Sequence, residues 1–216
     1  MSTRATLARI RLNPQSRAVQ RDLRDATEMH RTLMRLVPDH LGESPRRAAK
    51  LLYRLDETGT TSTLLVQATT LDPARLPDDY GHCDVRDLTP MFNALKKDLA
   101  VRYRIVVNPV KTKRLPLEQK GQRGNRVPLT GPEADQWWIR RASEAGLELH
   151  TMLPTPAGTA YLRGKGTGSE RYHLMRYDGT ATVTDPYALT DAVLTGIGRA
   201  KSYGAGLLSL APAGTA

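Results

Sequence analysis

Polar and hydrophobic residues alternate at the start of the chain, from Ala5 to Leu12, in the pattern of a β-strand with one buried face. An Asn-Pro pair ends this strand. From about Ser16 to Val37 the apolar residues recur with the period of a helix, which ends before Pro38. The sequence therefore predicts a strand that leads into one long helix.

The rest of the first half carries the signals of a β-hairpin. A short helix is expected at Arg46 to Lys50, and strands are expected at Leu51 to Asp56 and Ser62 to Thr70, with the turn at Glu57 to Gly59 between them. Prolines, aspartates and a glycine then interrupt Leu71 to Pro90, which leaves room for one short strand. We expect a domain boundary at the end of this stretch.

The second half opens in the same way as the first. Asp98 to Pro109 alternates as a strand and again stops at Asn-Pro, and a basic, glycine-bearing loop follows from Lys111 to Arg126. Pro132 opens a helix that closes near Gly146. A strand at Leu147 to Leu153 comes next.

The last third predicts a second hairpin and a final strand. Strands at Arg171 to Tyr177 and Thr180 to Asp185 are expected to join at Asp178-Gly179, a dipeptide typical of tight hairpin turns. A helix from about Pro186 to Leu194 then leads through a glycine-rich loop into a final LLSL strand.

Each half thus has a strand, a helix and a hairpin in the same order. This repetition favours an α+β protein of two tandem ferredoxin-like (RRM-like) βαββαβ domains, the first spanning residues 1–92 and the second 98–216. A single α+β sheet is the alternative.

The predicted long helix has an apolar stripe and a basic ridge. On a helical wheel the stripe faces the core, and it consists of Val19, Leu23, Ala26, Leu33 and Val37. The ridge lies on another sector and consists of Arg17, Arg21, Arg24, Arg31 and Arg35. The ridge is a candidate phosphate-binding surface, although exposed arginines are often only solvated.

His30 lies at the border of the stripe and the ridge. An imidazole titrates at about pH 6.5, so it exchanges a proton near neutrality, and neighbouring arginines would lower its pKa by penalising the cation. Cleavage of RNA by its own 2′-hydroxyl needs alignment, proton transfer and stabilisation of a charged phosphorane. His30 is therefore the leading catalytic candidate, and a hydrogen-bonded structural histidine is the alternative.

The net charge points to a polyanionic partner. The chain carries 32 Lys and Arg against 22 Asp and Glu, a formal charge of +10 with a sequence pI near 10.0. Nucleic acid leads the candidates because phosphate neutralisation releases counterions. An anionic membrane is the rival, but no apolar run approaches the roughly 18 residues of a membrane span. We expect a soluble, cytoplasmic protein with no membrane partner.

Cysteine and histidine usage argues against a metal centre. The single Cys83 excludes cysteine clusters, and the five histidines never lie within a helical turn of one another. We expect catalysis without a metal or another cofactor.

The segment from Gly196 to Pro212, GIGRAKSYGAGLLSLAP, is the most distinctive of the chain. Its glycines would let backbone N–H groups approach a phosphate, and Arg199, Lys201 and Ser202 would add charge and a hydroxyl. An ordinary glycine turn is the alternative. Further candidates for RNA contact are the basic residues Lys111, Lys113, Arg126, Arg163 and Lys165.

Aromatic residues make up only 5% of the chain, and no paired stacking motif of single-strand RNA-binding sheets is present. Any RNA would then be recognised through the backbone and groove of a folded stem.

Five segments together resemble a known family, the CasE family of repeat-RNA endoribonucleases of the type I-E CRISPR Cascade complex. They are the N-terminal strand that ends in Asn-Pro, EMHRTL (Glu28 to Leu33), RIVVNPVK (Arg104 to Lys111), RVPL (Arg126 to Leu129) and the glycine-rich segment. The resemblance spans nearly the whole chain. It implies tandem ferredoxin-like domains, metal-free cleavage at the base of each repeat hairpin to cyclic-phosphate or 3′-phosphate and 5′-hydroxyl ends, and retention as a Cascade subunit beside the other subunits.

The resemblance also assigns residues. It places the family's catalytic histidine at His30, and a basic hairpin that enters the stem's major groove at Arg163 and Lys165. The family often has a tyrosine three residues before the histidine, where this chain has Thr27. That departure keeps a second hypothesis open, a non-catalytic subunit that binds the RNA hairpin and supports assembly. A third is a basic DNA-binding or ribosome-associated protein.

Overall fold

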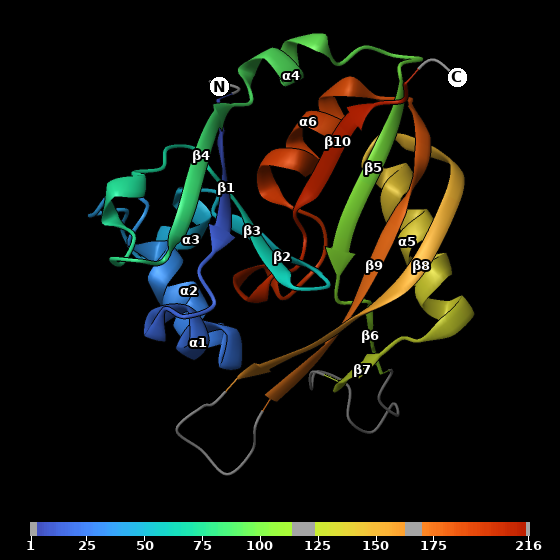
Figure 1. The fold of residues 1–216 in the computed structure, drawn as a ribbon. Coiled ribbons are helices and arrows are strands. Elements are labelled where there is room, and N and C mark those ends of the chain that lie inside the picture. Colours follow the sequence, from blue (N-terminus) through green and yellow to red (C-terminus); the bar gives the residue numbers. More distant parts are fainter. Residues whose placement is uncertain (1–3, 114–123, 163–169, 215–216) are drawn as a thin grey trace.

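Two four-stranded antiparallel sheets dominate the computed structural model, which describes residues 4–113, 124–162 and 170–214 (Figure 1). The strand orders are β2-β3-β1-β4 and β10-β5-β9-β8. In both sheets the first strand of the unit lies between two later strands, as in a ferredoxin-like fold. The predicted α+β class and tandem ferredoxin-like architecture are confirmed. The domain limits 1–92 and 98–216 stay a prediction.

The first sheet is built around its earliest strand. The alternation near the N-terminus places Ile10 in the core, where it pairs with Leu64 of β3 on one side and Cys83 of β4 on the other. Between β3 and β4 the second helix of a ferredoxin-like unit is reduced to the 3-10 turn η1 (Pro73–Arg75). The strands are β1 (Thr6–Leu12), β2 (Leu52–Thr58), β3 (Thr61–Ala68) and β4 (Gly81–Asp87).

The prediction of one long helix after β1 is wrong, because the chain forms two helices, α1 (Arg17–Arg24) and α2 (Ala26–Met34). Asp25 between them is extended, with φ −144° and ψ 109°, and its carboxylate accepts a hydrogen bond from the Thr27 N–H at 2.9 Å. Aspartate in this position satisfies a free N–H of the helix that follows, so a new helix begins there.

The break changes which side chains face the core. Val19, Leu33 and Val37 are buried as predicted, but Leu23, placed on the same stripe, is 39% exposed. The wheel assumed one continuous axis, and the break rotates α1 relative to α2. The five arginines therefore do not form a single straight ridge. A short helix, α3 (Pro45–Ala48), follows them.

The predicted hairpin at Asp178-Gly179 is also wrong. The chain runs straight through this dipeptide as one strand of the second sheet, in which Gly179 pairs with Tyr103 on one side and Met152 on the other. A Cβ at Gly179 would lie 2.0 Å from the carbonyl oxygen of Thr151. Glycine here permits a close approach of neighbouring strands and does not mark a turn. The strands are β5 (Ala100–Val107), β8 (Leu147–Leu162), β9 (Glu170–Val183) and β10 (Leu208–Pro212).

Helices on one face of the second sheet enclose the larger core. Trp137 and Trp138 of α5 (Gly131–Glu144) are buried there, and α6 (Pro186–Thr195) contributes to the same cluster. The short helix α4 (Thr89–Ala94) adds Phe92 to this core. None of the helices in the described part of the chain is long and apolar enough to cross a membrane.

Three smaller features complete the second half. A two-stranded ribbon of β6 (Val110–Thr112) and β7 (Arg126–Pro128) follows β5, and the 3-10 turn η3 (Lys201–Tyr203) lies in the glycine-rich segment. The strands β8 and β9 extend past their sheet as an arm that reaches the side of α1 and α2 (Figure 1).

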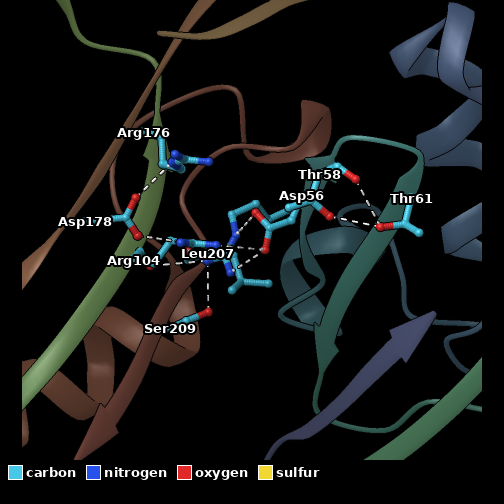
Figure 2. Close-up of polar contacts among 9 residues, drawn as sticks. Asp56, Thr58, Thr61, Arg104, Arg176, Asp178, Leu207 and Ser209 are labelled. Atoms are coloured by element: carbon cyan, nitrogen blue, oxygen red, sulfur yellow. Dashed lines mark hydrogen bonds and ion pairs between the residues drawn. The ribbon is translucent and has the colours of Figure 1, made fainter. Parts of the chain in front are cut away.

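A buried polar contact fixes the two sheets relative to one another. The Arg54 side chain of β2 is 3% exposed, and it binds both carboxylate oxygens of Asp56 at 2.9 and 3.0 Å. It also donates to the second domain, to the carbonyl oxygen of Arg104 at 3.2 Å and to Ser209 Oγ at 2.9 Å. Figure 2 shows how the network continues through Arg104 to Asp178. The domains are thus joined through charge-assisted hydrogen bonds as well as apolar packing.

Candidate active site

His30 lies where α2 of the first domain meets η3 of the second. Its ring centroid is 6.5 Å from that of Tyr203, and the planes are inclined at 66° in an edge-on contact. The fold thus brings the predicted catalytic histidine and the glycine-rich segment together, although about 170 residues separate them in sequence.

The surroundings of His30 favour its neutral form. The side chain is half-buried, and its Nδ1 atom is buried with no hydrogen-bond partner in the described structure. Burial lowers the pKa of the His30 imidazole below the ordinary histidine value, and the positive charge of Arg46 lowers it further. At neutral pH the ring is therefore uncharged and able to accept a proton.

Replacing Arg46 with methionine tests this electrostatic account. We expect the pKa of His30 to lie below the ordinary value in the native protein and to rise toward it in Arg46→Met, because a repelling cation is removed while burial remains. NMR titration of the imidazole measures both values. The matched control is Arg47→Met, since Arg47 is exposed and does not contribute to the His30 shift. An unchanged pKa in Arg46→Met would contradict the assignment.

A basic groove of about 570 Å³ has Tyr203 in its lining. It is formed by α3, the β6–β7 ribbon, the start of β9 in the β8–β9 arm and the glycine-rich segment. Five of its lining side chains are cationic, and no acidic residue of the described structure lines it. Such a groove attracts phosphates. The lining residues are Arg46, Asn108, Val110, Arg126, Pro128, Arg171, Tyr172, Gly198, Arg199, Ala200, Lys201, Ser202 and Tyr203.

Packing determines the shape of the glycine-rich segment. Gly196 has φ 76°, and a Cβ there would lie 2.7 Å from the Leu52 side chain of the first domain. The N–H groups of Gly196, Ile197 and Gly206 are hydrogen-bonded to backbone carbonyls. These three N–H groups are therefore not available to cradle a phosphate.

Lys201 is the most constrained of those cations. Its Nζ donates to the carbonyl oxygen of Thr195 at 2.8 Å. Burial lowers the pKa of the Lys201 ammonium, and the charge of Arg46 lowers it further. The charge of Asp191 opposes this effect on Lys201 but does not cancel it, so an anion is favoured at that point of the groove.

The groove contains only part of the predicted RNA-binding set. Arg199, Lys201 and Ser202 line it, and Arg126 joins them from β7. Arg24 lines a second cavity of about 220 Å³ under the β8–β9 arm, which shares Tyr203 with the groove.

The other predicted cations lie elsewhere or outside the described residues. Arg31 is exposed and ion-paired with Glu28, and Arg35 is exposed at the C-terminal cap of α2. Lys111 pairs with Glu133 at 2.6 Å, and Lys113 is exposed after β6. Arg163 and Lys165 lie outside the described residues.

Sequence reasoning missed five polar or aromatic groove residues, which are Arg46, Asn108, Arg171, Tyr172 and Tyr203. Arg46, Tyr172 and Tyr203 come from three separate elements, and only the fold brings them together. For Asn108, the Asn-Pro pair that ends β5 was a sequence feature that could have pointed to the residue. Its buried side chain donates to the carbonyl oxygen of His173 at 2.9 Å, which ties β5 to β9 beside the groove.

The described residues contain no group of three or more His, Cys, Asp and Glu side chains that could hold a metal ion. The groove instead concentrates arginine and lysine, which bind phosphate oxygens directly.

Two ferredoxin-like domains, with a basic groove between their elements and a neutral histidine in contact with one of its lining residues, define a class of protein suited to binding a polyanion. The chain belongs to the family described as CRISPR associated protein, whose model matches residues 7–212. The resemblance to CasE noted in the sequence is thereby confirmed.

Three comparisons make the relationship concrete. The chain is 33% identical to the CRISPR-associated endoribonuclease Cse3 of Thermus thermophilus, over 95% of this chain and 99% of that protein. It is 28% identical to the CRISPR system Cascade subunit CasE of Escherichia coli, over 88% and 93%. The structure of Thermus thermophilus Cse3 bound to an RNA representing a pre-cleavage complex superposes with a TM-score of 0.79 and 30% identity, covering 97% of this chain and 100% of that one.

Proposed function

We propose that this protein is a metal-independent endoribonuclease that cleaves CRISPR precursor transcripts at the base of the repeat hairpin and remains bound to its product as a Cascade subunit. The single observation that carries the proposal is the neutral, half-buried imidazole of His30 in contact with Tyr203, a residue that also lines the basic groove. The named activities of the Thermus and Escherichia relatives support the same substrate class. The cytoplasm, where such transcripts are made, is its proposed location.

His30 acts as the general base of the first step. It takes the proton of the ribose 2′-hydroxyl, and the 2′-oxygen attacks the adjoining phosphorus. The bond from phosphorus to the 5′-oxygen of the next nucleotide breaks, which leaves a 2′,3′-cyclic phosphate on one product and a 5′-hydroxyl on the other. The lowered pKa of His30 suits this role, because the base is already deprotonated at neutral pH.

Groove cations stabilise the extra negative charge of the phosphorane. Arg46 is the cation whose charge lowers the pKa of His30, and the same charge lowers the pKa of Lys201. Arg199, Arg126 and Arg171 extend the positive surface along the groove and would hold the flanking phosphates of the stem. This arrangement binds a folded RNA by its backbone.

A repeat hairpin with a single 2′-deoxy substitution at the scissile nucleotide tests the reaction. In EDTA we expect the native protein to cleave the all-ribose hairpin, to leave the deoxy hairpin intact, and to bind both with equal affinity, because only the nucleophile has changed. Gel separation of labelled RNA, with acid opening of the cyclic phosphate, identifies the ends.

The same experiment separates the alternatives. Tight binding of the all-ribose hairpin without cleavage under any condition would favour a non-catalytic assembly subunit, which the threonine at position 27 keeps in consideration. Equal affinity for duplex DNA would favour a general nucleic-acid-binding protein.

A further inference from the structure

Tyr203 is the side chain that connects His30 to the basic groove. Its ring contacts the His30 ring edge-on at 6.5 Å, and the same residue lines the groove beside Lys201. A phosphodiester that reaches the imidazole from the groove must therefore also meet Tyr203.

The Tyr203 ring is fixed before any substrate arrives. It stacks on Tyr172 of β9, with centroids 5.3 Å apart and planes inclined at 19°. Its backbone belongs to η3, and the carbonyl oxygen of the preceding residue in that turn, Ser202, accepts a hydrogen bond from Tyr53 of the first domain at 3.2 Å. Contacts from two other elements thus hold the ring, as expected of a group that must be positioned precisely enough for chemistry.

The Tyr203 hydroxyl differs from those of the structural tyrosines. No hydrogen bond to it is found among the described residues, although a phenol can donate one and accept others. Four other buried tyrosine hydroxyls all donate to a protein oxygen: Tyr53 to Ser202, Tyr80 to Asp22, Tyr103 to Thr151 and Tyr177 to Asp135. The hydroxyl belongs to a ring that lies edge-on to the candidate base, and without a hydrogen bond among the described residues it is available to a ligand.

We infer that Tyr203 is a second catalytic residue of the proposed ribonuclease, the general acid that protonates the 5′-oxygen leaving group. The inference rests on the proposed function. As the 2′-oxygen bonds to phosphorus and its proton passes to His30, the bond from phosphorus to the 5′-oxygen breaks, and that oxygen takes the phenolic proton of Tyr203. The tyrosinate then regains a proton from water, and the imidazolium returns one, so both groups end in their starting states.

The need for a general acid separate from the general base follows from the neutral state of His30. A deprotonated imidazole can accept the first proton but has none of its own to give in the same step, so a separate donor is needed. The Tyr203 phenol can donate a hydrogen bond, and so a proton, to the departing 5′-oxygen.

The substitution Tyr203→Phe combined with a change of leaving group tests the assignment. Phenylalanine keeps the ring and its stacking on Tyr172 but removes the proton. We expect single-turnover cleavage of the normal hairpin to slow by about 100-fold, the scale of a lost general acid. A hairpin whose scissile 5′-oxygen is replaced by sulfur needs no protonation of its leaving group, so Tyr203→Phe should cleave it at a rate within about threefold of the native protein.

Two control variants make the result specific. Tyr187→Phe removes a phenol that is 88% exposed at the start of α6, and it should cleave both substrates at the native rate. His30→Ala should remain slow on both, because the sulfur leaving group does not replace a base.

The possible failures are distinguishable. An equal loss for Tyr203→Phe on the two substrates, or no loss on either, would overturn the assignment of Tyr203 and direct the search for the acid to Lys201. Rapid cleavage of the normal hairpin by His30→Ala would instead remove His30 as the base, and failure of the native protein to cleave either hairpin would overturn the proposed function itself.

Discussion

Replacing His30 with alanine is expected to lower the single-turnover rate of hairpin cleavage by about 1000-fold, within the range for loss of a positioned proton-transfer group. The affinity for the hairpin should change little. His30 does not line the groove, and its neutral ring contributes no charge to phosphate binding at neutral pH. Rates measured with excess protein in EDTA, together with gel-shift affinities, give both quantities.

The lowered pKa of His30 also predicts how the cleavage rate depends on pH. Because the pKa of His30 is lowered, the active, neutral form should persist to a pH below the ordinary histidine value, and the rate should fall only at lower pH. Raising the pKa through Arg46→Met should move this acid limb to higher pH. His82→Ala, which removes an exposed imidazole of β4, is the matched control and should leave the rate unchanged. Persistent cleavage by His30→Ala would remove the histidine from the mechanism.

Periodicity was a sufficient guide to the strands and the fold but not to the axis of the first helix. Alternating residues placed β1 and β5 correctly because each has one buried face. The apolar period from position 16 to 37 looked continuous because Asp25, a residue compatible with a helix surface, does not interrupt it. Its role as a helix cap depends on one local hydrogen bond to Thr27, which a helical wheel does not represent.

The error at Gly179 has a different origin. An Asp-Gly dipeptide favours a tight turn locally, but the long pairing of β9 with both β5 and β8 outweighs that preference. The glycine is required by the approach of the Thr151 carbonyl, which belongs to a strand far away in sequence. Local turn signals cannot report such a contact.

The sequence predicted those residues of the candidate site that stand out by their own chemistry and local sequence context. His30 and Lys201 could be singled out because a helix border and a glycine-rich segment are visible in sequence. Arg46 and Tyr203 could not, since their importance lies only in their distance from His30 in the folded chain. That distance in turn depends on how the two domains are joined.

The joint between the domains gives the largest expected effect on stability. Asp56→Ala leaves the Arg54 guanidinium buried, with hydrogen bonds to neutral oxygens only. Removing one partner of a buried ion pair costs about 3 kcal/mol or more. For a chain of this length, that loss corresponds to a melting temperature lower by roughly 6–12 °C. Thermal unfolding followed by circular dichroism measures it.

An exposed ion pair provides the matched control for this change. Asp84→Ala removes the carboxylate that binds Arg9 at 2.9 Å on the outer face of the first sheet, where the arginine side chain is 53% exposed, so little change in the melting temperature is expected. If Asp56→Ala destabilised the protein no more than Asp84→Ala, the Arg54 network would not be what joins the domains.

Below its melting temperature, Asp56→Ala should also cleave the hairpin about tenfold more slowly than the native protein. His30 and Tyr203 lie on opposite sides of the joint between the domains, and small displacements of reacting groups lower the rate strongly. Asp84→Ala should cleave it at the native rate.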